Sequence, residues 1–206
     1  VSKDKPVLLD FRTPDGYLKM VNVNGKEIEP SVKNEHIIIP KRLLKKGANV
    51  VIIGFRAGDQ SLNRNADYLY TLFVPDRACT AFPCFDQPDL KAWFNLTLEI
   101  PSSYEAIANN SVVREESAPG KKIITYAEGE KLPTYLFAFA AGKFQRIEKD
   151  VDGVRMEMLH RETRKDYVER NADDIFRLHY KAIKWMEEYT GIKYPFPKFG
   201  FVVIPT

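Results

Sequence analysis

The sequence predicts a mainly β chain, with an antiparallel β-sandwich followed by a small α+β segment that contains one long helix. Three observations lead to this fold class. About eight short runs of strand-forming residues, separated by turn signals, fill the chain up to about residue 145, as is typical of a β-sandwich. Apolar residues then recur at helical spacing. A proline-containing turn leads from there into a last apolar run, 199–204.

The strands of the first part follow from alternation and from turn residues. Residues 17–23 alternate, and the Asn24-Gly25 pair after them is a strong hairpin signal. Residues 68–74 carry β-formers on both faces, which predicts a strand buried on both sides. In 92–100, every second residue from Phe94 to Ile100 is apolar, so one face should be buried. Further strands are expected at 36–39, 49–55, 105–113, 122–127, 135–140 and 154–159, with one helical turn over 41–46.

The helix is predicted from a stripe of apolar residues after residue 170. Its members are Ile175, Leu178, Ala182, Met186 and Tyr189, and Ile183 widens the stripe. Gly191 occupies the position of a C-terminal glycine.

Composition excludes several classes of protein. Of the 206 residues, 44% are hydrophobic, which is enough for a core, and the net charge is +3. Basic residues are interleaved with acidic ones, so nucleic-acid binding is not predicted. No apolar run approaches the ~18–20 residues that cross a bilayer, so no membrane segment is predicted in this chain.

The chain offers no convincing catalytic set. Its histidines, His36, His160 and His179, do not form the H-E-x-x-H pattern of a zinc peptidase. Cys79 and Cys84 could be joined across a short loop, but two buried free thiols are the favoured interpretation. Neither catalytic nor metal-binding residues are therefore assigned.

The proline-rich segment 75–88 is apolar for a loop, so its backbone donors need partners. An Asp side chain can accept bonds from nearby backbone N–H groups. We therefore expect Asp86 to be largely buried and to accept such bonds, in a structural role.

Residues 77–92 resemble the signature of the gluzincin (M1) aminopeptidases, the aminopeptidase N-like zinc enzymes. The matching residues are Phe82, Pro83, Cys84, Phe85, Asp86, Pro88, Lys91 and Ala92, and Gln87 stands where the family usually has Glu. A second stretch agrees: residues 189–205 resemble the helix end, Y-P-x-P-K turn and strand that begin the family's catalytic domain. The likeness covers about residues 40–206.

The resemblance implies a piece of a longer zinc aminopeptidase, which removes N-terminal residues from peptides. Residues 1–146 would be most of its saddle-shaped N-terminal β-sandwich, which caps the active site. Residues 147–206 would begin the catalytic domain. The zinc ligands of the family are not in this chain, so zinc and peptide substrate belong to the full-length parent, and the chain alone should be inactive.

One departure from the family concerns substrate binding. Where the family often has T-Q-F-E-P before the loop, this chain has Thr71-Leu72-Phe73-Val74-Pro75. Leu72 and Val74 lie on one side of a strand, so an apolar pair replaces a polar one. We expect them to form a wall of the first substrate pocket; the alternative is that both are sandwich core.

Two other functions stay open from the sequence alone. The chain could come from a noncatalytic aminopeptidase-like scaffold, or it could be an unrelated β-sandwich binding module. The apolar helix stripe and the strand at 199–204 would normally pack against a whole catalytic domain. In this chain we expect them to lie against the β-domain or against another copy of the chain, because an exposed apolar patch favours association.

Overall fold

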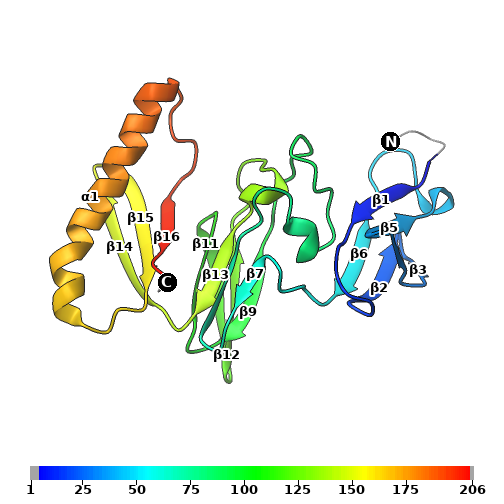
Figure 1. Cartoon of the computed structure of the whole chain (residues 1–206), viewed down its shortest axis with the longest axis horizontal. Coiled ribbons are helices and arrows are strands. Elements are labelled where there is room, and N and C mark those ends of the chain that lie inside the picture. Colours follow the sequence, from blue (N-terminus) through cyan, green and yellow to red (C-terminus); the bar gives the residue numbers. More distant parts are fainter. Residues whose placement is uncertain (1–4, 205–206) are drawn as a thin grey trace. The chain divides into compact units, whose positions relative to one another are not determined.

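The computed structural model describes residues 5–204 and is mainly β with one long helix, as predicted (Figure 1). Its contacts divide the chain into two compact units. The first comprises the residues up to Arg64, 70–92 and 131–138; the second comprises 65–69, 93–130 and the residues from Phe139 onward. This division follows contacts within the chain, and the functional boundary between residues 146 and 147 stays a prediction.

The first unit contains two three-stranded antiparallel sheets. One has the order β1-β5-β4, and the other the order β3-β2-β6. Their bounds are β1 (Val7–Asp10), β2 (Leu18–Val23), β3 (Lys26–Ile28), β4 (Val32–Lys33), β5 (His36–Ile39) and β6 (Val51–Phe55). Val21 and Val23 of β2 and Ile37 and Ile39 of β5 share one buried core with Phe11. The sandwich packing predicted from the sequence is present here.

Turn chemistry explains the connections of this unit. Asn24 and Gly25 both have positive φ, 53° and 88°, which is what a two-residue hairpin between β2 and β3 requires. The predicted helical turn after β5 is a short 3-10 helix, η1 (Lys41–Leu43).

The strand predicted at 68–74 is shorter and more open than expected. After β7 (Leu62–Arg64), β8 covers only Tyr68–Thr71, and all four of its residues are half-buried. The prediction of a strand buried on both sides was therefore wrong. The residues after Thr71 leave the sheet and enter a loop that contains the 3-10 helix η2 (Ala78–Thr80).

The second unit contains a further pair of packed sheet layers. Its strands are β9 (Thr97–Pro101), β10 (Glu105–Ala108), β11 (Val112–Ala118), β12 (Lys121–Tyr126) and β13 (Phe139–Gly142). One sheet has the order β11-β12-β9, and β10 and β13 belong to a sheet of order β10-β13-β8-β7. The buried residues between them include Ile100, Ala106, Ile124 and Ala141. In 92–100 the predicted alternation is confirmed: Phe94, Leu96 and Leu98 are half-buried and Ile100 is buried. A last 3-10 helix, η3 (Thr134–Leu136), precedes β13.

The C-terminal part of the second unit is a three-stranded sheet covered by the helix (Figure 1). The sheet has the order β14-β15-β16, with β14 (Gln145–Val151) antiparallel and β16 (Phe199–Val202) parallel to β15 (Val154–His160). The helix α1 (Lys165–Thr190) ends at Gly191, whose φ of 68° is the left-handed cap that the sequence predicted. Among residues 5–204 the structure shows no helix with the length and apolar character that a membrane span requires.

The helix is confirmed, but only part of the predicted stripe packs on the sheet, namely Ile175 and Ile183. Ala172, Phe176 and Ile183 are the buried residues of α1. Leu178 and Tyr189, which belong to the predicted stripe, are 67% and 76% exposed. The buried side and the exposed side of α1 both carry apolar residues at helical spacing, so periodicity alone could not tell which side faces the sheet.

Replacing Phe176 tests this assignment. Phe176 is fully buried among Met156, Met158 and Phe201, so Phe176→Ala should lower the free energy of unfolding by about 3–5 kcal/mol. Chemical denaturation of the 206-residue chain at low micromolar concentration measures it. Leu178→Ala is the matched control and should change stability by less than about 0.5 kcal/mol. The reverse ranking would show that Leu178, and not Phe176, lies on the core side of the helix.

Candidate functional site

The loop that follows β8 is held to the N-terminal strand by backbone bonds. The Asp10 N–H donates to the Cys84 carbonyl at 2.8 Å, and the Cys84 N–H donates back to the Asp10 carbonyl at 3.1 Å. The Arg12 N–H donates to the Cys79 carbonyl at 2.9 Å. The loop that carries the predicted motif is therefore held in place by backbone hydrogen bonds to the N-terminal strand.

Asp86 organises the interior of this loop. Its Oδ2 accepts the Cys79 N–H at 2.9 Å, and its Oδ1 accepts the hydroxyl of Thr134. The expected backbone bond is thus present. The side chain is half-buried and not largely buried as expected, and the neighbouring residues Phe85 and Gln87 are exposed.

Asp10 has a matching role that the sequence did not reveal. Its Oδ2 accepts the Asp86 N–H at 3.0 Å and the side-chain amide of Gln87 at 2.9 Å. Its Oδ1 lies 3.1 Å from Nε2 of His36. More than 70 residues separate Asp10 from the loop, so no local pattern could have pointed to it. Together these side chains line a small hollow of about 220 Å³ with Arg12 and Cys79.

Gln87, the departure from the usual Glu, fits this position. Its amide donates to a carboxylate oxygen of Asp10, whereas a Glu would place a second negative charge there. The substitution therefore suits the local arrangement of charge.

The two cysteines are free and buried, so the favoured interpretation is confirmed. Burial raises the pKa of the Cys79 thiol to about 12, and the bond to Asp86 acts in the same direction. Burial also raises the pKa of the Cys84 thiol. Because the thiolate is the nucleophilic form, neither cysteine is a catalytic candidate.

The other motif residues divide into a packed set and an exposed set. Phe82 and Pro83 are half-buried, and the Phe82 ring packs edge-on against Phe73 at 5.5 Å. Phe85, Pro88 and Lys91 are exposed. The motif thus contains residues that pack inside the loop and residues that are exposed to solvent.

Leu72 and Val74, the predicted substrate wall, are on the surface of the chain. They are 49% and 51% exposed, whereas Phe73 between them is 2% exposed. In the described chain the pair is therefore not core. Their exposure makes both side chains available to a ligand, and contact with substrate stays a prediction.

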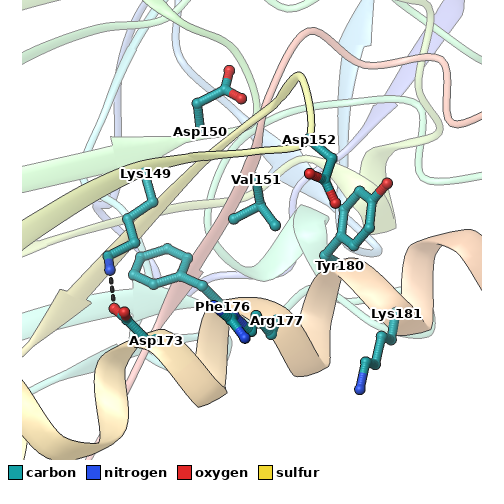
Figure 2. Close-up of a pocket in the computed structure, with 9 residues that line it drawn as sticks. All are labelled: Lys149, Asp150, Val151, Asp152, Asp173, Phe176, Arg177, Tyr180 and Lys181. Carbon is teal, nitrogen blue, oxygen red and sulfur yellow. Dashed lines mark hydrogen bonds and ion pairs between the residues drawn. The ribbon is translucent and has the colours of Figure 1, made fainter.

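A larger hollow, of about 450 Å³, lies between the end of the β14–β15 hairpin and α1 (Figure 2). Val151, Phe176 and Tyr180 supply its apolar surface. Lys149 from the hairpin is ion-paired with Asp173 from the helix. Its nine lining residues include no His, Cys or Ser, so it could bind a ligand but offers no nucleophile or imidazole base.

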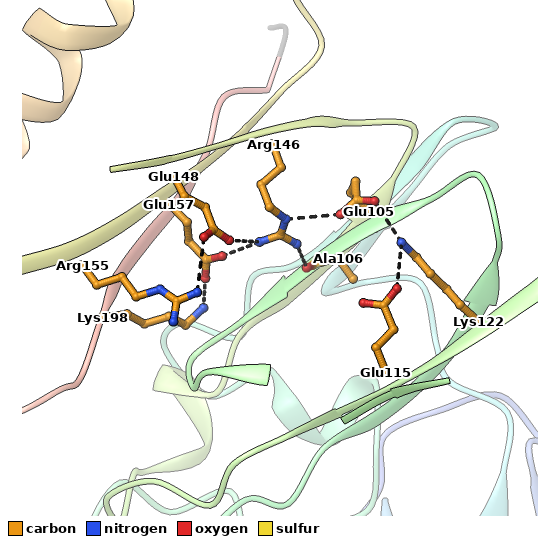
Figure 3. Close-up of polar contacts among 9 residues, drawn as sticks. All are labelled: Glu105, Ala106, Glu115, Lys122, Arg146, Glu148, Arg155, Glu157 and Lys198. Carbon is orange, nitrogen blue, oxygen red and sulfur yellow. Dashed lines mark hydrogen bonds and ion pairs between the residues drawn. The ribbon is translucent and has the colours of Figure 1, made fainter. Parts of the chain in front are cut away.

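The most buried charges of the second unit surround Glu157 (Figure 3). Glu157 on β15 is ion-paired with Lys198, the lysine of the Y-P-x-P-K turn, and with Arg146 on β14. The Lys198 side chain is 4% exposed and that of Glu157 8%. Burial lowers the pKa of Lys198 to about 8, and the positive charges of Arg146 and Arg155 act in the same direction.

Arg146 extends this network to the neighbouring sheet. It donates to the Ala106 carbonyl and, from Nε, to Glu105 at 3.2 Å. Burial alone would raise the pKa of Glu105, but its bonds to Lys122 and Arg146 outweigh it and lower that pKa. The carboxylate form of Glu105 is therefore favoured in the folded chain. The stability that this provides is present at neutral pH and is lost in acid, as the pH falls through the lowered pKa.

None of these clusters is a metal site. Within residues 5–204, no group of three His, Cys, Asp or Glu side chains is arranged to hold a metal ion. His179 stacks on Phe201, with ring centroids 4.1 Å apart, and His160 is buried. The residues present do not fit the zinc that the sequence resemblance implies, so no catalytic step can be assigned to them.

Comparison with known proteins places these features in context. Residues 54–136 match the family described as Peptidase M1 N-terminal domain. The chain is 38% identical over 138 residues to puromycin-sensitive aminopeptidase from Caenorhabditis elegans, a match that covers 66% of this chain and 14% of that protein. It is 33% identical over 138 residues to Aminopeptidase M1 from Arabidopsis thaliana, covering 66% of this chain and 15% of that protein.

A solved structure supports the same fold. The crystal structure of Legionella pneumophila aminopeptidase A in complex with aspartic acid matches 98% of this chain and 25% of its own chain, with a TM-score of 0.80 and 16% identity. Since the identity is low, this likeness concerns the fold alone. The matched region spans only about a seventh of the length of the relatives in sequence.

Removing the Asp86 carboxylate should destabilise the loop. Asp86→Ala leaves the Cys79 N–H and the Thr134 hydroxyl without their acceptor, which should cost about 1–3 kcal/mol of unfolding free energy. Asp89→Ala is the control, because Asp89 is exposed in the same loop. Its free energy of unfolding should stay within about 0.5 kcal/mol of that of the unmodified chain. Equal stability of the two variants in urea denaturation would refute a structural role for Asp86.

Neutralising Glu157 should have a larger effect. Glu157→Gln leaves Lys198 and Arg146 buried without their shared carboxylate, and breaking such a pair costs about 3–5 kcal/mol. Glu148→Gln removes a carboxylate from the same network, but its side chain is 45% exposed, so less than about 1 kcal/mol is expected. Melting curves of both variants measure the difference. A Glu157→Gln chain as stable as the unmodified chain would contradict a stabilising role for the Glu157 ion pairs.

Proposed function

The chain belongs to the peptidase M1 family, and from this premise we propose that it serves as the substrate-facing N-terminal part of a zinc aminopeptidase. The observation that carries the proposal is the agreement of two separate stretches with one family. Residues 54–136 match its N-terminal domain, and the Y-P-x-P-K turn at 194–198 resembles the sequence that begins the family's catalytic domain. In this proposal the longer parent removes N-terminal residues from peptides, and this chain caps its active site.

The zinc belongs to another part of the parent in this proposal. The family implies zinc, but the His, Cys, Asp and Glu side chains of residues 5–204 do not form a site for it. The role left to this chain is to bind and position the substrate and to exclude longer chains beyond its N-terminus. A noncatalytic scaffold of the same fold would share the β-domain but lack the H-E-x-x-H sequence in its longer chain.

Leu72 and Val74 are the proposed contribution to the substrate pocket. Both side chains are exposed and apolar, and the buried Phe73 ring between them packs against Phe82 and Phe137. This packing fixes the backbone from which the two side chains project. An apolar wall there would favour substrates with an apolar first side chain and leave recognition of the amino group to acidic residues elsewhere in the parent.

The chain is also proposed to self-associate. Leu178, Trp185, Tyr189 and Ile192 are each at least 60% exposed along the second half of the helix and just after it. Contiguous apolar surface of this kind favours association with another protein surface. The partner and the geometry are argued in the next subsection.

Metal and activity measurements test the main proposal. The purified 206-residue chain should hold no stoichiometric zinc and should not cleave aminoacyl substrates, because a ligand set is missing from its described residues. The longer protein, identified from its transcript by an H-E-x-x-H sequence after residue 206, should hold one zinc and cleave them. A transcript without that motif would favour the scaffold, and one tightly bound zinc in the short chain would contradict the proposal.

Val74→Glu in the longer protein tests the substrate wall. A protonated substrate amine beside the new carboxylate should lower KM for free-amine substrates by up to about fivefold. The gain should fade above about pH 8, as the α-amine loses its proton. Val113→Glu is the control, because Val113 is another exposed valine, on β11, and it should leave KM unchanged. The wall hypothesis fails if Val74→Glu unfolds the protein, as Phe73→Ala is expected to do, or if KM does not change.

A further inference from the structure

The helix α1 has two apolar sides, and only one of them is covered by the sheet. Ala172, Phe176 and Ile183 face the sheet. Leu178, Ala182, Trp185 and Tyr189 lie on nearly the opposite side of the helix and are all exposed. We call these four residues the outer seam of α1.

The spacing of the outer seam is that of a helix-pairing surface. Its residues are four, three and four positions apart, which is the spacing of the a and d positions of a coiled coil. A helix with one partner needs a single apolar stripe, so the second stripe indicates a second partner. The rings of Trp185 and Tyr189 are stacked, 5.2 Å apart and inclined by 7°. This pair therefore presents a flat, ordered surface, and Trp and Tyr are the residue types that dominate binding energy at interfaces.

We propose that the outer seam pairs with the outer seam of a second copy of this chain, with the two helices antiparallel. The proposal rests on the self-association put forward above and specifies its surface and register. In a two-fold antiparallel pair, Ala182 lies opposite Trp185 of the second copy, and Leu178 lies opposite Tyr189. A small residue meets the largest one at the centre, which lets the two helices approach closely.

The charges beside the seam select this arrangement. Lys181 and Glu188 are exposed and flank the seam on one side. In the antiparallel register Lys181 lies opposite Glu188 of the second copy, and the two-fold axis repeats this pair. In a parallel pair each residue would lie beside its own counterpart, so Trp185 would meet Trp185, and Lys181 would have Met186 as its nearest flanking neighbour. In the antiparallel pair, therefore, a small side chain faces a large one and opposite charges face each other.

The expected association is weak. The two helices overlap over about 14 residues, or about 21 Å of helix, because the register centres the contact near the C-terminal end of α1. Contacts smaller than a standard interface are typical of transient complexes. Dimers should therefore form over a micromolar to millimolar range of protein concentration.

Charge reversal provides the test, because it alters exposed side chains and spares the fold. Lys181→Glu and Glu188→Lys should each weaken the dimer by roughly tenfold, since two attractive pairs become repulsive. An equimolar mixture of the two variants should regain the parent affinity, because both cross-pairs are then attractive. Arg177→Glu and Glu169→Lys make the same changes of charge at exposed positions away from the seam and should have no effect. Sedimentation velocity over the concentration range gives the dissociation constants.

Each outcome decides between the proposals. Rescue in the mixture, together with loss of dimer in Trp185→Lys, supports the antiparallel pairing. A dimer that is insensitive to both charge reversals overturns the register but leaves self-association standing. A chain that is monomeric at every concentration overturns both, while the aminopeptidase assignment is tested separately by zinc and activity.

Discussion

A buried carboxylate needs cations or hydrogen-bond donors around it. In the second unit, Glu157 is such a carboxylate, and the elements around it must supply its partners. Its partners come from two different segments: Arg146 from β14 and Lys198 from the turn before β16. Arg146 also bonds to Glu105 and Ala106 of β10. The position of β16 beside β15, and the connection of this sheet to β10, thus depend on one side chain. Replacing the set with apolar residues would relieve the desolvation cost but would lose this definition of register.

In the first unit, two aspartates accept hydrogen bonds from backbone N–H groups of the proline-rich loop. The loop from Pro75 to Ala92 is rich in proline, and a loop without regular pairing needs acceptors for its remaining N–H groups. Asp86 serves the Cys79 N–H, and Asp10 serves the Asp86 N–H. The two carboxylates therefore form a chain of bonds from β1 into the loop, which holds the aromatic packing of Phe73 and Phe82 in place.

The sequence could predict features that depend on neighbouring residues. The Asn24-Gly25 hairpin, the alternation up to Ile100 and the Gly191 cap each have a local cause, and each is confirmed. Features that depend on distant contacts were not predictable in the same way. The role of Asp10 involves a partner 76 residues away, and which apolar side of α1 is buried depends on which side meets the sheet.

For the candidate site, the sequence predicted the hydrogen bonding of side chains better than it predicted their burial. The M1 motif directed the prediction to the loop at 75–88, and the acceptor role of Asp86 in that loop is confirmed. Asp86 is less buried than expected, and residues 68–74 are not a doubly buried strand. The reason is the same in both cases. Residue type indicates what a side chain can bond to, whereas exposure is decided by what packs over it, and a run of β-formers reads alike whether it is covered or open.

These observations also narrow what the loop could offer a substrate. A protonated α-amine needs a carboxylate with free acceptor capacity. Asp86 is occupied by Cys79 and Thr134, and Asp10 by the loop backbone, Gln87 and His36. The position that is usually Glu in the family is Gln87, which itself donates to Asp10. Leu72 and Val74 add apolar surface but no charge. Asp86 and Asp10 therefore act on the loop itself. In the proposed function, Leu72 and Val74 would contact an apolar side chain of the substrate, and acidic residues elsewhere in the full-length protein would bind its amino group.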